Sequence, residues 1–279
     1  MSRFLFGTCL ILAFVSAADA QEYRSAREAR AAAATHLRSR NFAAAQAPLE
    51  AALRLTPETD LRGRVEISRT LMSCYRLLPE PDKMIESVEY ILQHSDSSSE
   101  RSNVARDLAS FLHQRGKVDA VVARYEERLK QNAKDPAALA VLTMIHLHLP
   151  AGQKERGKVL EKQLQALDRE RAVAKAQRLA KDADADPAAA ASNWKDVANA
   201  WIEAGDKNQA QAAVEKSLKA MPEARSGILT KFWHEGIGDV MLELGQREQA
   251  VVQYQEALKF APTGLQKSLE DKIAKAKNG

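Results

Sequence analysis

One pattern constrains the fold of this chain more than any other: a unit of two helical segments recurs at a nearly constant spacing. Aligned on one position of the second segment, the units are centred on Ala45, Met84, Val121, Gly157, Ala210 and Ala250. Neighbouring centres lie 36 to 40 residues apart, except for 53 residues between Gly157 and Ala210. Repeats of this length with two helices each form solenoids, in which one unit buries its apolar face against the next. The spacing therefore predicts a helical solenoid.

Local signals agree with an all-α chain. No Asn-Gly or Asp-Gly turn joins two segments of alternating hydrophobicity, as a β-hairpin would need. Asp135-Pro136 and Asp186-Pro187 are typical of helix starts, where an N-cap is followed by a proline in the first turn. Helix breaks inside the two-helix units are predicted near Gly116, Pro150, Gly205 and Gly245.

The last unit shows why small residues recur. It reads WHEGIGDVMLELGQREQAVVQYQEALKFAP over residues 233–262, and it resembles a tetratricopeptide repeat. The positions that carry the resemblance are Gly238, Met241, Gly245, Ala250, Tyr254, Ala257 and Pro262. Glycine and alanine let two antiparallel helices approach closely, and an aromatic ring one turn away fills the space beside them. One departure is that the tryptophan of the motif would fall on His234, while Trp233 lies one residue early.

The preceding unit, residues 194–222, keeps the same offsets, and weaker copies extend toward the N-terminus. The resemblance implies an all-α fold, a right-handed helical solenoid of antiparallel helix pairs. The predicted organisation is a signal peptide, degenerate N-terminal repeats, a charged Ala-rich helix or linker, C-terminal repeats and a charged helix or tail, at 1–20, 21–169, 170–190, 191–265 and 266–279.

The N-terminus predicts export. Arg3 precedes an apolar run over residues 4–15, and Ala18-Asp19-Ala20 forms a cleavage site before Gln21, as in a secretory signal peptide. The run is too short for a stable membrane anchor. Cys9 lies near the start of the run rather than at its end, which disfavours lipidation. The mature protein is expected to be periplasmic or extracellular, with no stable membrane anchor.

The residues do not predict an enzyme, a cofactor or a metal site. There is no phosphate-binding glycine loop, no G-x-S-x-G and no H-E-x-x-H. His146 and His148 are two residues apart, so on a helix they point in different directions and cannot chelate one metal. After signal cleavage Cys74 is the remaining cysteine, and its apolar surroundings predict a buried, inert thiol. A formal charge of +4 without long basic clusters does not favour nucleic-acid binding.

In the family that the sequence resembles, ligands lie along the concave face formed by the first helices of the pairs. Carried over to this chain, the candidate groove residues are Lys195, Asn199, Ile202, Glu235, Asp239 and Leu242 in the C-terminal half and Arg69, Ser73, Arg76, Arg106, Ser110 and His113 in the N-terminal half. Lys195 and Asn199 are one turn apart, like part of the clamp that some members use for a C-terminal carboxylate. The next unit offers Gly236 and acidic residues instead of further partners for such a clamp.

These observations predict an exported, non-catalytic scaffold that binds a protein or peptide partner in a cell-envelope complex. An alternative is a saccharide-binding protein or an enzyme that uses the acidic, tryptophan-bearing C-terminal groove. Glu235, Asp239 and Glu243 share one helix stripe, which is poor geometry for flanking a scissile bond. A third hypothesis is that the basic segment 154–181 docks on an anionic membrane lipid or polymer, although a solvated charged helix explains it better. The partner and the oligomeric state are not predicted.

Overall fold

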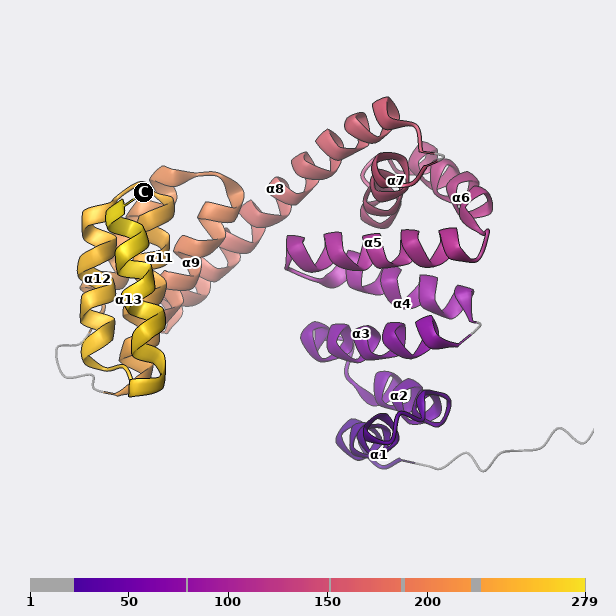
Figure 1. The fold of residues 1–279 in the computed structure, drawn as a ribbon, viewed down its shortest axis with the longest axis horizontal. Coiled ribbons are helices and arrows are strands. Elements are labelled where there is room, and N and C mark those ends of the chain that lie inside the picture. Colours follow the sequence, from indigo (N-terminus) through magenta and orange to yellow (C-terminus); the bar gives the residue numbers. More distant parts are fainter. Residues whose placement is uncertain (1–22, 79, 151, 187–188, 222–226, 279) are drawn as a thin grey trace, which may run out of the picture. The chain divides into compact units, whose positions relative to one another are not determined.

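The computed structural model describes residues 23–78, 80–150, 152–186, 189–221 and 227–278. The predicted signal peptide and Cys9 lie outside these residues. Within them the chain forms 13 α-helices and no strand, which confirms the all-α prediction (Figure 1). The helices are α1 (Ala26–Arg38), α2 (Phe42–Leu55), α3 (Leu61–Leu77), α4 (Pro81–His94), α5 (Ser98–Gln114), α6 (Val118–Gln131), α7 (Pro136–His148), α8 (Lys154–Ala185), α9 (Ala190–Ala204), α10 (Lys207–Lys219), α11 (Ile228–Glu243), α12 (Arg247–Lys259) and α13 (Thr263–Asn278).

The chain divides into two compact units, residues 1–80 and 81–279. In the first, α1 and α2 form a pair and α3 packs on α2. Asn41 and Asp60 cap α2 and α3 by accepting hydrogen bonds from the backbone amides of Ala44 and Gly63. Cys74 is fully buried in α3, and burial raises the pKa of its thiol, as expected of an inert cysteine.

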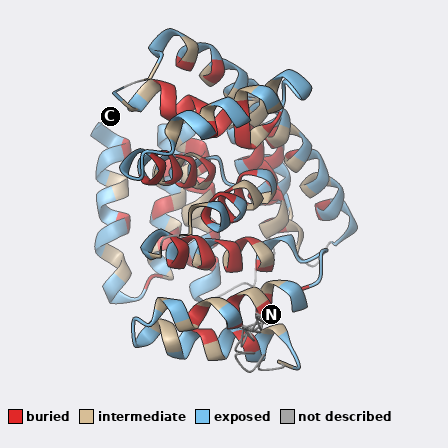
Figure 2. Cartoon of the chain, turned by 90° about the vertical axis from the view of Figure 1, so that its right-hand side faces the viewer, coloured by how far each residue is buried: buried red, intermediate tan, exposed pale blue. Residues whose placement is uncertain are grey.

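The helix order follows the predicted repeat spacing, and closely packed pairs form at α1/α2, α7/α8, α9/α10 and α11/α12. The six predicted centres fall in the even-numbered helices α2, α4, α6, α8, α10 and α12. All six are buried, and Figure 2 shows that buried residues lie on the helix sides that face other helices. The predicted breaks also lie between helices, and Gly116, Gly205 and Gly245 have positive φ angles of 63°, 78° and 84° there. Glycine adopts this conformation without the steric cost that a Cβ imposes.

In the second unit, α7 departs from the amphipathic pattern. Each residue from Ala137 to His146 is buried, because α7 packs against α4, α5, α6 and α8. A helix that is apolar on all sides belongs inside a core. It begins where the sequence predicts, since Asp135 accepts a hydrogen bond from the Ala138 amide at 2.9 Å and Pro136 occupies the first turn.

The longest helix, α8, spans 32 residues. Gly157 near its start lies against Leu147 of α7, while Ala183 near its end packs in the core formed by α9–α13. Residues 170–185 are thus the second half of α8. This helix packs against α7 and against α9, and it occupies most of the residues that lengthen the repeat interval to 53. The helix start predicted at Asp186-Pro187 follows α8. Asp186 accepts a hydrogen bond from the Ala189 amide there, and α9 begins at Ala190. Pro187 lies outside the described residues. The proposed domain boundaries remain predictions.

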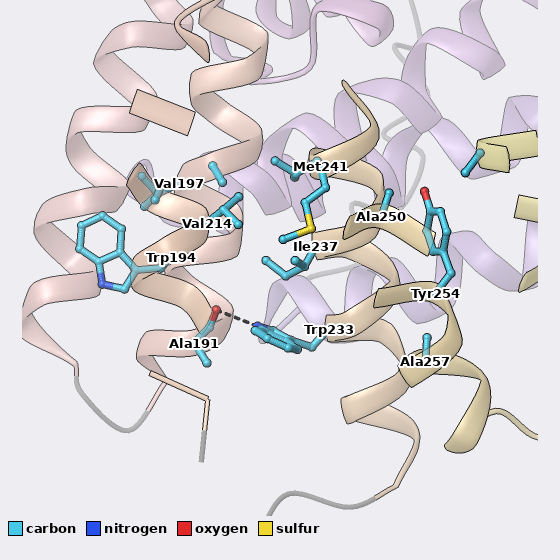
Figure 3. Close-up of a cluster of buried hydrophobic side chains, with 14 of the residues drawn as sticks. Ala191, Trp194, Val197, Val214, Trp233, Ile237, Met241, Ala250, Tyr254 and Ala257 are labelled. Carbon is cyan, nitrogen blue, oxygen red and sulfur yellow. Dashed lines mark hydrogen bonds between the residues drawn. The ribbon is translucent and has the colours of Figure 1, made fainter. Parts of the chain in front are cut away.

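The helices α9–α13 form the part that most resembles the motif. The pairs α9/α10 and α11/α12 each pack closely, and α13 packs on α12. A Cβ built on Gly238 of α11 would lie 2.6 Å from the Tyr254 ring of α12, so glycine is needed at this crossing. Ala250 is fully buried beside them (Figure 3). These contacts confirm the close approach that the small residues predict.

Replacing Ala250 by phenylalanine should overpack this crossing. A bulky side chain in a filled core forces side chains off their rotamers, so the free energy of unfolding should fall by about 1–3 kcal/mol. Urea denaturation of the variant measures the change. An unchanged midpoint would show that position 250 does not face α11. As a control, Val252→Phe on the same helix should have little effect, because Val252 is 51% exposed.

Candidate partner-binding site

The acidic groove candidates of the C-terminal half are engaged by lysines of the same chain. Glu235 accepts a hydrogen bond from Lys231 and lies 3.0 Å from Lys272 Nζ. Asp239 accepts from Lys272 at 2.7 Å and from the Tyr254 hydroxyl at 2.8 Å. Burial alone would raise the pKa of Glu235, but the hydrogen bonds from both lysines hold it below its usual value. This network ties α13 to α11 and α12.

The other C-terminal candidates do not form a clamp. Lys195 Nζ pairs with the neighbouring Asp196 at 3.2 Å, and Asn199 is exposed. Ile202 and Leu242 are partly buried and pack against the core. A site for a carboxylate needs several convergent donors, which these four side chains do not provide.

The tryptophans serve the core. Trp233 is 6% exposed, and its Nε1–H donates to the Ala191 carbonyl at 3.0 Å (Figure 3). The same N–H also donates to Ser217 Oγ at 3.1 Å. Trp194 is 8% exposed, and Lys216 Nζ lies 3.8 Å from its ring centroid. A sugar needs an open ring face, so neither side chain offers a platform. The saccharide hypothesis therefore loses these two rings, and the third, Trp201, is partly buried against the same core.

The candidates of the N-terminal half are exposed and aligned. In the first unit, Arg69, Ser73 and Arg76 lie on one stripe of α3, and Arg62 extends it by two turns. Between them Glu66 pairs with Arg30 of α1 at 3.0 Å, which links the first helices of two successive pairs. This helix face carries the groove residues expected from the resemblance, and it is rich in arginine. We call Arg62, Arg69, Ser73 and Arg76 the α3 stripe.

In the second unit, Arg106, Ser110 and His113 form a comparable exposed stripe on α5. The two units differ in the type of basic residue that they contain. Residues 1–80 contain no lysine, so every basic side chain there other than histidine is an arginine. Arginine presents a planar fork of donors that matches a carboxylate, and it holds its charge at all physiological pH values.

The basic residues of segment 154–181 are largely paired within the chain. Arg156 pairs with Glu126 at 2.8 Å, and Lys175 pairs with Glu203 at 2.9 Å. Arg171 donates to backbone carbonyls of α4. Among the described residues, no helix combines the length and the apolar character that a membrane crossing requires. The segment behaves as a charged helix that binds its neighbours.

The buried His146 gives the fold a predictable response to acid. Gln153 N–H donates to its Nδ1 at 3.3 Å, and its Nε2 lies 3.8 Å from Glu126, which also binds Arg156. Burial lowers the pKa of His146 below its ordinary 6.5. The unfolded chain therefore takes up the proton first, and stability should decrease as the pH falls below about 6.5. Thermal denaturation of His146→Asn should lose this part of the pH dependence, whereas the exposed His148→Asn should keep it.

In the described part of the chain, no group of three or more His, Cys, Asp or Glu side chains is placed to hold a metal ion. No family model and no curated protein matches the chain. Among solved structures, it is similar to a tetratricopeptide repeat protein from Parabacteroides merdae, with 14% identity, a TM-score of 0.29 and coverage of 92% of this chain and 100% of that one. It is also similar to a thermophilic TPR protein from Thermus thermophilus, with 18% identity, a TM-score of 0.28 and coverage of 76% and 98%. Both belong to the family that the sequence resembles.

Proposed function

We propose that the chain is an exported, non-catalytic helical-repeat scaffold that binds an acidic segment of a protein partner on the first-helix face of its first unit. The observation that supports this most is the α3 stripe, in which Arg62, Arg69 and Arg76 are exposed on one side of a helix. The only acidic residue of α3, Glu66, pairs with Arg30 of α1 at 3.0 Å and with Arg62 of the stripe at 3.8 Å. Clustered arginines on a first-helix face favour a carboxylate-rich ligand by charge complementarity.

A non-catalytic role is supported by the engagement of the acidic candidates. General acid–base chemistry needs carboxyl groups that reach a substrate. Glu235 and Asp239 are instead bound by Lys231, Lys272 and Tyr254 inside the C-terminal helices. We therefore assign these side chains to the architecture rather than to a reaction.

The test uses a fluorescein-labelled acidic peptide and its lysine-substituted counterpart in anisotropy titrations with the full chain. The acidic peptide should bind and the basic one should not. Arg69→Gln/Arg76→Gln should weaken binding about tenfold, a typical effect of removing two charge-assisted contacts. The control Arg40→Gln/Arg54→Gln removes the same charge from other exposed positions of the first unit. Equal losses in both variants would reject the α3 stripe as the binding surface.

Export is proposed from residues 1–20, whose composition is that of a signal peptide. Mass spectrometry of the protein recovered outside the cytoplasm should find a chain that begins at Gln21. A chain that retains residues 1–20 in that fraction would contradict cleavage, and a chain found in the cytoplasm alone would contradict export.

A further inference from the structure

The long helix α8 joins the two halves of the second unit. On one side α4, α5 and α6 each pack against α7, and α7 packs against α8. On the other side α9 packs against α8, and the helices α10–α13 pack on α9 or on one another. We call these groups the α4–α7 arm and the α9–α13 arm. The contacts of α8 therefore decide how one arm is held on the other.

The middle of α8 has little apolar support. None of the residues 161–171 is buried. The buried residues of α8 lie on either side of this stretch: Gly157 and Leu160 before it, and Ala172, Ala176 and Ala183 after it. A segment with few buried apolar contacts changes its conformation at a low free-energy cost. This stretch is therefore where α8 bends most easily when nothing else restrains it.

Three polar contacts restrain α8 from outside. They reach the corner of residues 92–101, where α4 ends and α5 begins, and we call them the α8 latch. The contacts are Arg101 to Asp168 at 2.6 Å, Arg171 to the carbonyls of Leu92 and Gln93 at 3.0 and 3.2 Å, and Arg178 to Asp96 at 3.4 Å. Arg171 thus binds carbonyls in the last turn of α4, which have no donor within their own helix.

The latch connects the two arms. The second half of α8 belongs to the α9–α13 arm, since Ala183 is buried in its core and Lys175 pairs with Glu203 of α9 at 2.9 Å. Arg171 and Arg178 lie on this half, while their acceptors lie on the α4–α7 arm. Their release leaves the middle of α8 as the main connection between the arms.

The latch crosses a hollow rather than an apolar interface. The hollow has a volume of about 380 Å³, and Asp96, Asp168, Arg171 and Arg178 line it. Water replaces a lost hydrogen-bond partner beside such a space, so each contact contributes little net free energy. The pair of Arg178 and Asp96 is exposed on both sides, which makes it sensitive to salt. The latched and released arrangements therefore differ by a small free energy.

We propose that the α8 latch is a conformational switch of the second unit. When it is closed, it fixes the α9–α13 arm in one orientation on the α4–α7 arm. When it is open, α8 bends within residues 161–171 and the α9–α13 arm takes up further orientations. High ionic strength favours the open state, because it weakens the ion pairs and leaves the apolar cores of both arms intact. No residue of the first unit takes part, so the inference is independent of the proposed function.

The experiment is a distance measurement between the two arms of the full chain. Spin labels are attached to Ala123→Cys of α6 and Ala212→Cys of α10, which replace exposed residues, while burial protects Cys74 in the folded chain. Double electron–electron resonance should give one narrow distance distribution at about 0.01 M salt, where the Debye length is about 30 Å. At about 1 M salt, where it is about 3 Å, the distribution should broaden. Equally narrow distributions at both salt concentrations would overturn the proposal.

Two double variants separate the latch from the overall charge of α8. Arg171→Gln/Arg178→Gln removes two of the three contacts and keeps the Arg101–Asp168 pair, so this variant should fold. Lys162→Gln/Arg169→Gln removes the same charge from exposed residues of α8 that do not line the hollow. The latch variant should show a broad distribution already at low salt. The control should match the wild type at both salt concentrations.

A latch variant with a distribution as narrow as that of the wild type at low salt would contradict the proposal. A control as broad as the latch variant would also contradict it, because the charge of α8 would then matter rather than the contacts. Circular dichroism should find the same helix content in all three chains at both salt concentrations. A loss of helix content that accompanies the broadening would indicate unfolding instead of bending, and the switch would be rejected.

Discussion

Replacing Trp233 by alanine is expected to lower the free energy of unfolding by about 3–5 kcal/mol, the usual cost of removing a large aromatic side chain from a core. The ring is 6% exposed, and its Nε1–H binds both the Ala191 carbonyl and Ser217 Oγ. Removing it therefore opens a cavity and breaks the link from α11 to α9 and α10. Urea denaturation followed by circular dichroism measures the loss.

The neighbouring Phe232→Ala is the matched control, because Phe232 is 51% exposed. It should change stability by less than about 1 kcal/mol. If Trp233 were instead an open platform for a sugar, Trp233→Ala would be as stable as the control and would lose glycan binding. That pattern would revive the saccharide hypothesis.

The second large effect is expected at Glu235. Its replacement by alanine leaves Lys231, which is 4% exposed, without its carboxylate partner and also removes an acceptor from Lys272. Breaking a buried ion pair from one side costs about 3–5 kcal/mol, because the remaining charge stays out of water. The thermal midpoint should fall markedly. A Glu235→Ala variant that is stable but binds its partner less well would show that Glu235 is a groove residue rather than a structural one.

Glu243→Ala provides the comparison, since Glu243 is an exposed residue of the same helix and the same stripe. Its stability should stay within about 0.5 kcal/mol of the wild type. The pH dependence adds a second check on Glu235. The pKa of this carboxyl is lowered in the folded state, so its stabilising contribution is present above the unfolded pKa of about 4.5 and is lost as the pH falls. Glu235→Ala should lack that part of the acid response.

The parts of the fold that were predictable depend on short-range spacing. Gly238, Ala250 and Tyr254 occupy positions of the repeat motif because two neighbouring helices must cross closely there. All three residues lie within thirty residues of one another, so the pattern is visible in a single repeat. Gly205 and Gly245 mark turns for an equally local reason, the positive φ that each turn needs. Such constraints do not depend on how distant segments meet.

The candidate site was less predictable because its state depends on a helix farther along the chain. Glu235 and Asp239 lie one turn apart on α11, and Lys272 of α13, 33 residues beyond Asp239, binds both of them. Residues 266–279 are predicted as a charged helix or tail, and the apolar spacing of Leu265, Leu269 and Ile273 was the available signal that this helix packs. By packing on α12, α13 covers apolar side chains of the α11/α12 pair.

Two other features could not be predicted from the repeat pattern, because they depend on contacts between residues that are far apart in the sequence. Trp233 is one residue early relative to the motif, and its role becomes clear only when Ala191 and Ser217 are seen beside it. The buried Arg101 of α5 pairs with Asp168 of α8, which lies 67 positions farther along the chain. No spacing rule for a single repeat contains such a pair.

Helix pairs that complete one another's cores hold this fold together, and the Trp233 indole reports on that packing most directly. Hydrogen exchange and NOE measurements on the full chain should find its Nε1–H strongly protected and close to protons of Ala191 in α9 and Ser217 in α10. An indole N–H that exchanges as fast as an exposed one, without NOEs to either helix, would contradict the stacking of α11 on the α9/α10 pair.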